Sequence, residues 1–199
     1  ELCNLIFGTL TDCGLKNNQF TINVSNRKIV QGLINDLKIS EEKQIKVIRA
    51  IDKLDKPGFG LKGVEDLLKK ERKDQSGAIT KGADLSDEQT SQILNFLKVK
   101  DLKELKQNLK NPLSQEGIKE LEDIFEVLGY GSNLNQVKTN FTIVRGLSYY
   151  SDFIVETNLN FKITNNKGKE IDIGSICSGG AYAKLISRFR GVDIPGTGI

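Results

Sequence analysis

Two short segments in the last third of the chain carry side chains suited to binding chemistry. The first, VRGLSYYSDF, places the guanidinium of Arg145 within six residues of two adjacent phenols, Tyr149 and Tyr150. A guanidinium offers paired donors to phosphate or carboxylate oxygens and keeps its charge, and a phenol both donates and accepts hydrogen bonds. Arg145 is therefore a candidate anion-binding residue, and the alternative is an ion pair at the end of a strand.

The adjacent tyrosines cannot have the same role, because neighbouring side chains of an extended chain point to opposite faces. The second segment, GSICSGGAYAKL, has Gly179 and Gly180 just before a third tyrosine, Tyr182. Glycines permit the backbone to approach a ligand closely, although isolated glycines also mark simple bends. For Tyr149 and Tyr182 the alternative is a core aromatic ring whose hydroxyl bonds within the protein.

The composition excludes several classes of protein. The chain has 199 residues, of which 38% are apolar and 28% charged, as in ordinary soluble globular proteins. Its formal net charge of +3 does not by itself indicate binding to nucleic acid. The sequence has no histidine, so imidazole bases, histidine-containing triads and the commonest zinc chemistry are excluded. We therefore predict no metal site built by the protein itself.

The cysteines and the hydropathy pattern indicate the cellular setting. The three cysteines are far apart and form no C-x-x-C motif, which is typical of free thiols in a reducing cytosol. No apolar run approaches the roughly 20 residues that a membrane helix requires, and no signal peptide is visible. We expect a cytoplasmic protein without membrane contact. Because the sequence starts at Glu1 and contains no methionine, we also expect it to be a fragment of a longer protein.

Residues 1–39 have the pattern helix, strand, helix. Apolar residues recur at helical spacing from Leu2 to Leu10, and again from Val30 to Leu37. Between these stretches, apolar and polar residues alternate in FTINVS, which predicts a strand with one polar face. This arrangement predicts the first part of a core that contains both helices and strands.

Residues 40–131 show helical spacing throughout. Ser40 is expected to cap one helix, and Ser86 with Gln89 forms a capping box that opens another. No period of two interrupts this stretch. We therefore predict an all-α insertion domain within the core.

Residues 132–199 return to alternating spacing. A strand beginning at Phe153, a turn at NNKG and a returning strand that leads back toward Gly174 predict an antiparallel hairpin. A helix from Tyr182 to Phe189 is expected to follow. The predicted fold class is α+β: an antiparallel sheet with flanking helices, interrupted by the all-α insertion.

The two tyrosine-bearing segments resemble the two histidine-binding signatures of histidyl-tRNA synthetases, a class II aminoacyl-tRNA synthetase family, usually written RGLDYY and GGRYD. The first matches at five of six positions as RGLSYY, and Glu156 falls where the family commonly has an acid. The second matches less closely, as GGAYA. The resemblance implies a class II synthetase-like core with two parts, residues 1–39 and residues 132–199, the latter truncated before motif 3.

The resemblance also implies roles for individual residues. Arg145 would be the catalytic cation, in contact with the α-phosphate of ATP and the histidine carboxylate while histidyl-adenylate forms. The residues that would bind histidine are Arg145, Tyr149, Tyr150, Tyr182, Gly179 and Gly180. Mg²⁺ would accompany ATP, and the full-length protein, a homodimer, would transfer histidine to tRNA(His). Because motifs 1 and 2 and the motif 3 arginine are absent from these residues, we do not expect this fragment alone to aminoacylate tRNA.

A basic cluster lies within the predicted insertion. Its members are Lys69, Lys70, Arg72 and Lys73. In the resembling family an insertion at this place reaches toward the acceptor stem of tRNA, so the cluster is a candidate for phosphate contacts. The alternative is a solvated helix face, because the insertion is not broadly basic.

The two segments depart from the family pattern at several positions. The departures are Ser148 for an aspartate, Ser151 and Asp152 for a threonine-glycine pair, and Ala181 and Ala183 for an arginine and an aspartate. The last two remove an expected ion pair that would brace Tyr182. They leave open a non-catalytic relative, the histidine-sensing regulatory subunit of ATP phosphoribosyltransferase. A generic RNA-binding helical module is a further alternative.

Overall fold

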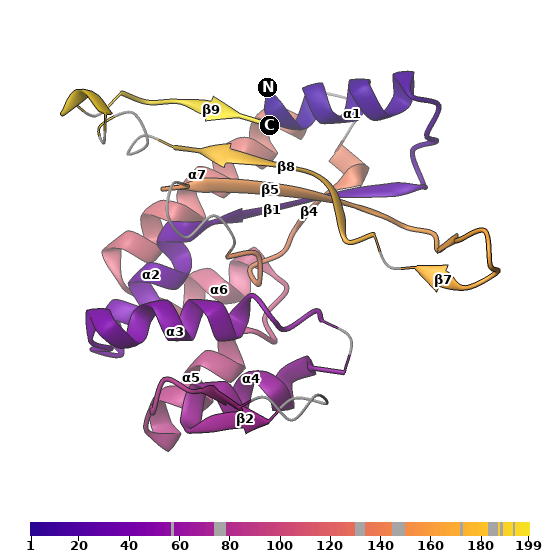
Figure 1. The fold of residues 1–199 in the computed structure, drawn as a ribbon. Helices are drawn as coiled ribbons and strands as arrows, with labels where there is room; N and C mark the ends of the chain where they lie inside the picture. The colour runs from indigo at the N-terminus through magenta and orange to yellow at the C-terminus, as the bar shows by residue number, and fades with distance from the viewer. Residues whose placement is uncertain are drawn as a thin grey trace.

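A five-stranded sheet forms the centre of the computed structural model (Figure 1). The structure describes residues 1–56, 58–73, 79–129, 134–144, 150–171, 173–182, 187, 189–192 and 194–199. In spatial order the strands are β4 (Val137–Thr139), β1 (Phe20–Asn26), β5 (Phe153–Leu159), β8 (Ser175–Ala181) and β9 (Thr197–Gly198). β1 and β4 are parallel, and the other neighbouring pairs are antiparallel. The predicted α+β class with a mainly antiparallel sheet is confirmed.

The sheet has one apolar and one polar face, as the alternation in β1 predicts. Phe20, Ile22 and Val24 are buried on the apolar face, whereas Asn23 between the last two is only partly buried. On the polar face the side-chain amide of Asn23 donates to Asn158 Oδ1 in β5 at 3.0 Å. The polar face is therefore the one that can present hydrogen-bonding groups to a ligand.

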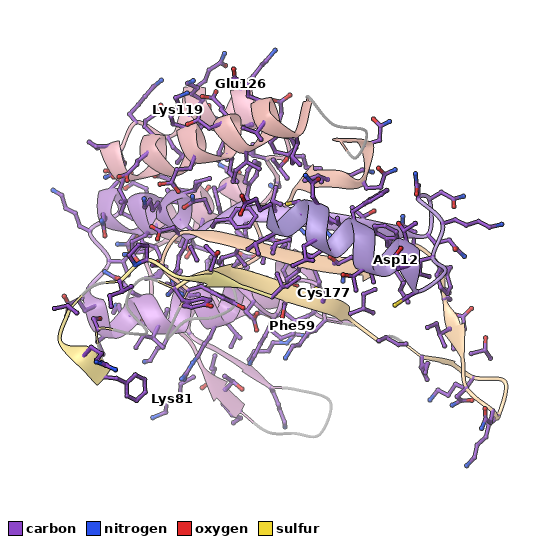
Figure 2. The ribbon with its side chains drawn as sticks, turned by 90° about the horizontal axis from the view of Figure 1, so that it is seen from above. Asp12, Phe59, Lys81, Lys119, Glu126 and Cys177 are labelled. Atoms are coloured by element: carbon purple, nitrogen blue, oxygen red, sulfur yellow. The ribbon has the colours of Figure 1, made fainter. Side chains whose placement is uncertain are left out.

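Helices cover the apolar face. Both α1 (Leu2–Asp12) and α7 (Pro112–Gly129) pack against β1, and α7 also contacts β5. α2 (Arg27–Asp36) follows β1 directly and packs along α7. Figure 2 shows α7, with Lys119 and Glu126 labelled, running along one side of the sheet. The polar face is left on the other side.

The predicted insertion is not all-α, and that expectation is wrong. Its helices α3 (Glu41–Ile51), α4 (Gly60–Lys69), α5 (Asp87–Phe96) and α6 (Leu102–Asn108) lie on the β4 side of the sheet in Figure 1. Between α4 and α5, β2 (Glu71–Lys73) pairs with β3 (Ile79–Lys81) in a small antiparallel hairpin. Each strand has three residues and mostly exposed side chains, so it has no alternating apolar pattern to detect.

The two expected helix caps in the insertion differ in the structure. Ser86 Oγ accepts a hydrogen bond from the Gln89 N–H, and Gln89 Oε1 accepts one from the Ser86 N–H, which confirms the capping box. Ser40 is the N-cap of α3, but its side chain makes no capping hydrogen bond. Buried residues of these helices, such as Ile51 and Ile93, belong to the same hydrophobic cluster as the apolar face of the sheet.

A hairpin arm extends from the sheet between β5 and β8 (Figure 1). It contains the short strands β6 (Ile163–Thr164) and β7 (Glu170–Ile171). At its tip Gly168 has a φ of +74° and donates its N–H to Asn165 O at 2.9 Å. The predicted antiparallel hairpin with its turn at NNKG is therefore confirmed.

Of the helix predicted from Tyr182 to Phe189, residues 183–186 and 188 lie outside the described residues, and the prediction is wrong at Tyr182. Tyr182 is not helical, because its N–H donates to Gly196 O at 2.8 Å across from the returning strand β9. Helical conformation is found at Ser187 and Phe189, and the Phe189 ring is 83% exposed. The pairing with β9 was not expected, because a two-residue strand has no periodicity in the sequence. None of the described helices combines the length and hydropathy that crossing a membrane requires.

Candidate functional site

The ring of Tyr150 lies against the backbone of β8. A Cβ atom built on Gly180 would be 2.8 Å from Tyr150 Cδ1 and 3.1 Å from its Cε1. The same Cβ would be 2.6 Å from Phe153 O. Gly180 is therefore required by the close approach of the chain's own aromatic ring and of β5.

The ring of Tyr182 lies over the strand that pairs with β8. A Cβ atom built on Gly196 would be 2.7 Å from Tyr182 Cε2. One built on Gly198 would be 2.8 Å from the Tyr182 hydroxyl oxygen. That hydroxyl donates a hydrogen bond to Thr197 O at 3.0 Å. Because a phenolic oxygen that donates one hydrogen bond still accepts others, the oxygen keeps its acceptor capacity toward a ligand N–H.

The two rings lie on the same face of the sheet. Gly180 and Gly198 are directly opposite each other in the β8–β9 ladder. Side chains at directly opposed positions share a face, so the Tyr150 ring over Gly180 and the Tyr182 ring over Gly198 do so too. Ile154 is the partner of Gly180 in β5, and Glu156, two residues on, points to that face as well. This is the polar face described above, since Glu156 is opposite Asn23.

Gly179 has a different role from Gly180. Its Cβ would point to the other face and would be 2.5 Å from Ile199 Cγ2, with Gly198 O closer still. This glycine therefore permits β9 to approach β8. The predicted part of both glycines in histidine binding stays a prediction.

Two of the predicted site residues, Arg145 and Tyr149, lie outside the described residues, as do Ser148 and Ala183. Whether Arg145 lines one cavity with Tyr150 and Tyr182 therefore stays a prediction. The described part of the site consists of the two rings, the glycines beneath them and the neighbouring polar face.

The N-terminus of α2 holds the segment that follows Tyr150. The Arg27 N–H donates to Asp152 O at 2.9 Å, and the Arg27 guanidinium donates to Tyr150 O at 3.4 Å. Lys28 Nζ lies 3.1 Å from Asp152 Oδ1. Burial lowers the pKa of the Arg27 guanidinium. Sequence reasoning missed Arg27 and Lys28 as residues that support the site.

A signal for these two residues was present in the sequence. Cations in the first turn of a helix are disfavoured by the helix dipole, and α2 begins with two of them and no acid. Such a pair requires acceptors from outside the helix. Asn26, the N-cap, accepts from the Lys28 N–H at 3.0 Å and so fixes the start of the helix beneath the site.

The basic cluster in the insertion is divided by the structure. Lys69 pairs with Glu65 and Asp87, at 3.3 and 2.8 Å. Arg72 lies 4.2 Å from the centre of the Phe59 ring and donates to Gly58 O. These two side chains are therefore engaged in contacts with residues close to them in the sequence.

Lys70 and Lys73 differ from the other two members of the cluster. Both are exposed, and neither has an ion-pair partner within the part of the chain that the structure describes. Over the same part of the chain, no group of three or more histidine, cysteine, aspartate or glutamate side chains is arranged to hold a metal ion.

Comparison with known proteins identifies the family. All residues, 1–199, match the family model described as histidyl-tRNA synthetase. The chain belongs to the histidyl-tRNA synthetase family. The resemblance of the two tyrosine-bearing segments to that family is confirmed.

Individual members of the histidyl-tRNA synthetase family show how much of the protein this chain represents. Over its whole length the chain is 77% identical to a histidine–tRNA ligase of Pelagibacter ubique and 38% identical to one of Rhizobium rhizogenes. It covers 43% and 41% of those two proteins. The chain thus spans less than half the length of the curated relatives it matches.

Solved structures agree with the fold of a histidyl-tRNA synthetase. The histidyl-tRNA synthetase of a Nostoc species matches with a TM-score of 0.71 at 30% identity, over 92% of this chain and 40% of that one. A protein of Bacillus halodurans, named as an ATP phosphoribosyltransferase regulatory subunit/histidyl-tRNA synthetase, matches with a TM-score of 0.69 over 94% of this chain and 42% of that one. Its identity is 20%, so it supports the fold alone, and the regulatory-subunit alternative is not better supported.

Proposed function

We propose that the full-length protein is a histidine–tRNA ligase, which activates L-histidine with ATP to histidyl-adenylate and transfers the histidine to tRNA(His). The observation that carries this proposal is the convergence of the Tyr150 and Tyr182 rings on one polar sheet face, within a chain of the histidyl-tRNA synthetase family. Hydroxyl-bearing rings suit an imidazole, because they can meet its nitrogens with both donors and acceptors.

The side chains of this segment would bind and orient the substrate. Tyr150 and Tyr182 would contact the imidazole ring of histidine, and Tyr149 would support or join them. Arg145 would hold the histidine carboxylate next to the α-phosphate of ATP, where a fixed cation stabilises the charge that builds up at phosphorus. Gly179 and Gly180 would flank the bound amino acid.

ATP would bring its own metal ion. Mg²⁺ bound to the phosphates supplies charge neutralisation for the transferred group. The described residues hold no acidic cluster for such an ion, so we place it with the nucleotide. Residues of the remaining, larger part of the protein would supply the other contacts to ATP.

Contact with tRNA would use the exposed part of the basic cluster. Lys70 and Lys73 are exposed at the end of α4 and in β2, whereas Lys69 and Arg72 are committed to contacts within the insertion. Reversing both charges, in Lys70→Glu with Lys73→Glu, should weaken tRNA binding and lower its salt dependence by about one counterion per lost phosphate contact. An unchanged affinity and salt slope would discard this contact.

The assembly and location of the protein also belong to this proposal. We propose that it acts as a cytoplasmic homodimer, with residues 40–131 as an insertion in the catalytic domain. Sedimentation equilibrium of the full-length protein tests the dimer. A purely monomeric but active enzyme would refute it.

Histidine-dependent exchange of pyrophosphate into ATP tests the proposed activity directly. The full-length protein should catalyse this exchange with histidine and with no other amino acid. Tyr150→Phe should raise the KM for histidine by roughly tenfold, because one hydrogen bond to the ligand is lost. The fragment of residues 1–199 alone should show no exchange. A full-length protein without histidine-dependent exchange would refute the proposed function.

A further inference from the structure

One ammonium group joins α7 to the segment that carries Tyr150. Lys28 Nζ lies 2.7 Å from Glu116 and 2.5 Å from Glu120, both in α7, and 3.1 Å from Asp152. The Lys28 side chain is only 17% exposed. Three carboxylates around one cation would repel one another without it, so the position of Asp152 depends on Lys28.

Asp152 passes this restraint on to both tyrosine-bearing segments. Its Oδ2 accepts a hydrogen bond from Ser151 Oγ at 2.5 Å. Ser151 in turn donates its N–H to Ala181 O at 2.9 Å. Ser151 directly follows Tyr150, and Ala181 directly precedes Tyr182. A continuous path therefore runs from α7 through Lys28, Asp152 and Ser151 to both rings.

The Ser151–Ala181 hydrogen bond lies on the β5 side of Tyr182. On its other side, its N–H donates to Gly196 O, just before the two-residue strand β9, and its hydroxyl donates to Thr197 O, at the start of that strand. Such a short edge strand opens easily, because few hydrogen bonds hold it. The hydrogen bond from Ser151 to Ala181 continues the β5–β8 pairing beyond Ile154 and Gly180 and so reaches the residue next to Tyr182.

We propose that Lys28 and Asp152 are a positioning pair, which fixes Tyr150 and Tyr182 relative to each other and so sets the geometry of the amino-acid pocket. Neither side chain needs to touch the substrate; both act through the backbone of the tyrosine segments. The link to histidine rests on the proposed function. The mechanical part, in which the pair holds two segments together, stands on the described contacts alone.

Asp152→Asn in the full-length protein tests the pair. The variant keeps the shape of the side chain and leaves Lys28 with Glu116 and Glu120, so the fold is retained. The matched control is Glu122→Gln in α7. The Glu122 side chain is 32% exposed, against 28% for Asp152. Glu122 forms an ion pair of 2.8 Å with Lys106, which belongs to α6 and not to a tyrosine-bearing segment.

Two readouts separate positioning from general stability. In Asp152→Asn the backbone amides of Ser151 and Tyr182 should exchange with deuterium faster than in the wild type, whereas Glu122→Gln should leave both rates unchanged. The KM for histidine in pyrophosphate exchange should rise by about tenfold in Asp152→Asn, with kcat changed by less than about twofold. Lys28→Arg, which keeps the charge, should retain wild-type constants, and Lys28→Met should behave as Asp152→Asn does.

The outcomes that overturn the proposal are distinct from those that overturn the function. Unchanged amide exchange at Ser151 and Tyr182 in Asp152→Asn would show that the pair does not hold the segments. Faster exchange with an unchanged KM for histidine would show that it does not set the pocket. If the wild type has no histidine-dependent exchange, the proposed function fails, and the amide rates alone decide whether the pair holds the two segments.

Discussion

Replacing Gly180 with alanine is expected to destabilise the protein and to displace the Tyr150 ring. The new Cβ would lie 2.6 Å from Phe153 O and 2.8 Å from Tyr150 Cδ1, whereas ordinary contacts begin at 3.4 Å. The carbonyl would have to retreat by about 0.8 Å and the ring by about 0.6 Å. Because Phe153 O belongs to the backbone of β5, it cannot rotate away. Overpacking of this kind costs about 1–3 kcal/mol in the free energy of unfolding.

The same substitution at Gly8 is the matched control. Gly8 lies in α1, and a Cβ built there meets no atom within 4 Å. Alanine is favoured over glycine inside a helix by about 0.5–1 kcal/mol, so Gly8→Ala should stabilise the protein. In urea denaturation of the full-length protein the two variants should therefore differ by about 1.5–4 kcal/mol.

The activity assay gives the second half of this prediction. Since Gly180→Ala pushes the Tyr150 ring into the proposed pocket, the KM for histidine should rise by about tenfold, whereas Gly8→Ala should leave it unchanged. A Gly180→Ala variant with wild-type stability would refute the packing of Tyr150 against β8. Wild-type KM despite the loss of stability would refute the place of that ring in the pocket.

Three further predictions concern caps, thiols and pH. Ser86→Ala should lower the free energy of unfolding by about 1 kcal/mol, and Ser40→Ala should lower it by less than half as much. Of these two serines, only Ser86 makes a capping hydrogen bond with its side chain. Equal losses of the two variants in urea denaturation would contradict this. Alkylation followed by peptide mass spectrometry should modify the exposed Cys13 first and Cys3 last, since Cys3 is buried and burial raises the pKa of its thiol; the reverse order would contradict its burial. Burial alone would lower the pKa of Lys28, but hydrogen bonds to three carboxylates raise this pKa overall. The charged side chain therefore stabilises the folded state fully at pH values below the unfolded pKa of about 10.4. This stabilisation is lost as the pH rises from there through the higher pKa of the folded state. Lys28→Met should accordingly cost about 1–2 kcal/mol at neutral pH, and the cost should shrink above about pH 10.4; a cost that persists undiminished to about pH 12 would contradict the ion pairs.

Local patterns in the sequence determined most of the secondary structure. The helical spacing of Leu2 to Leu10, the alternation in FTINVS and the capping box at Ser86 each depend on neighbours a few residues away, and α1, β1 and α5 confirm them. The turn at Gly168 was equally predictable, because a positive φ is a local requirement. The family, too, follows from short runs of adjacent residues, since RGLSYY and GGAYA occupy continuous stretches of chain.

Tertiary structure alone decided which residues support those segments. Lys28, Glu116 and Asp152 are separated by 36 residues or more in the sequence. Only the packing of α2 on α7 and the pairing of β1 with β5 bring both carboxylates within 3.1 Å of the Lys28 ammonium group. The strands β2, β3 and β9 were missed for a related reason. With two or three residues each, they have too little length for a period of two, and they exist because a partner strand supplies their hydrogen bonds. Pairing across the fold is a property of three-dimensional position, which no local pattern encodes.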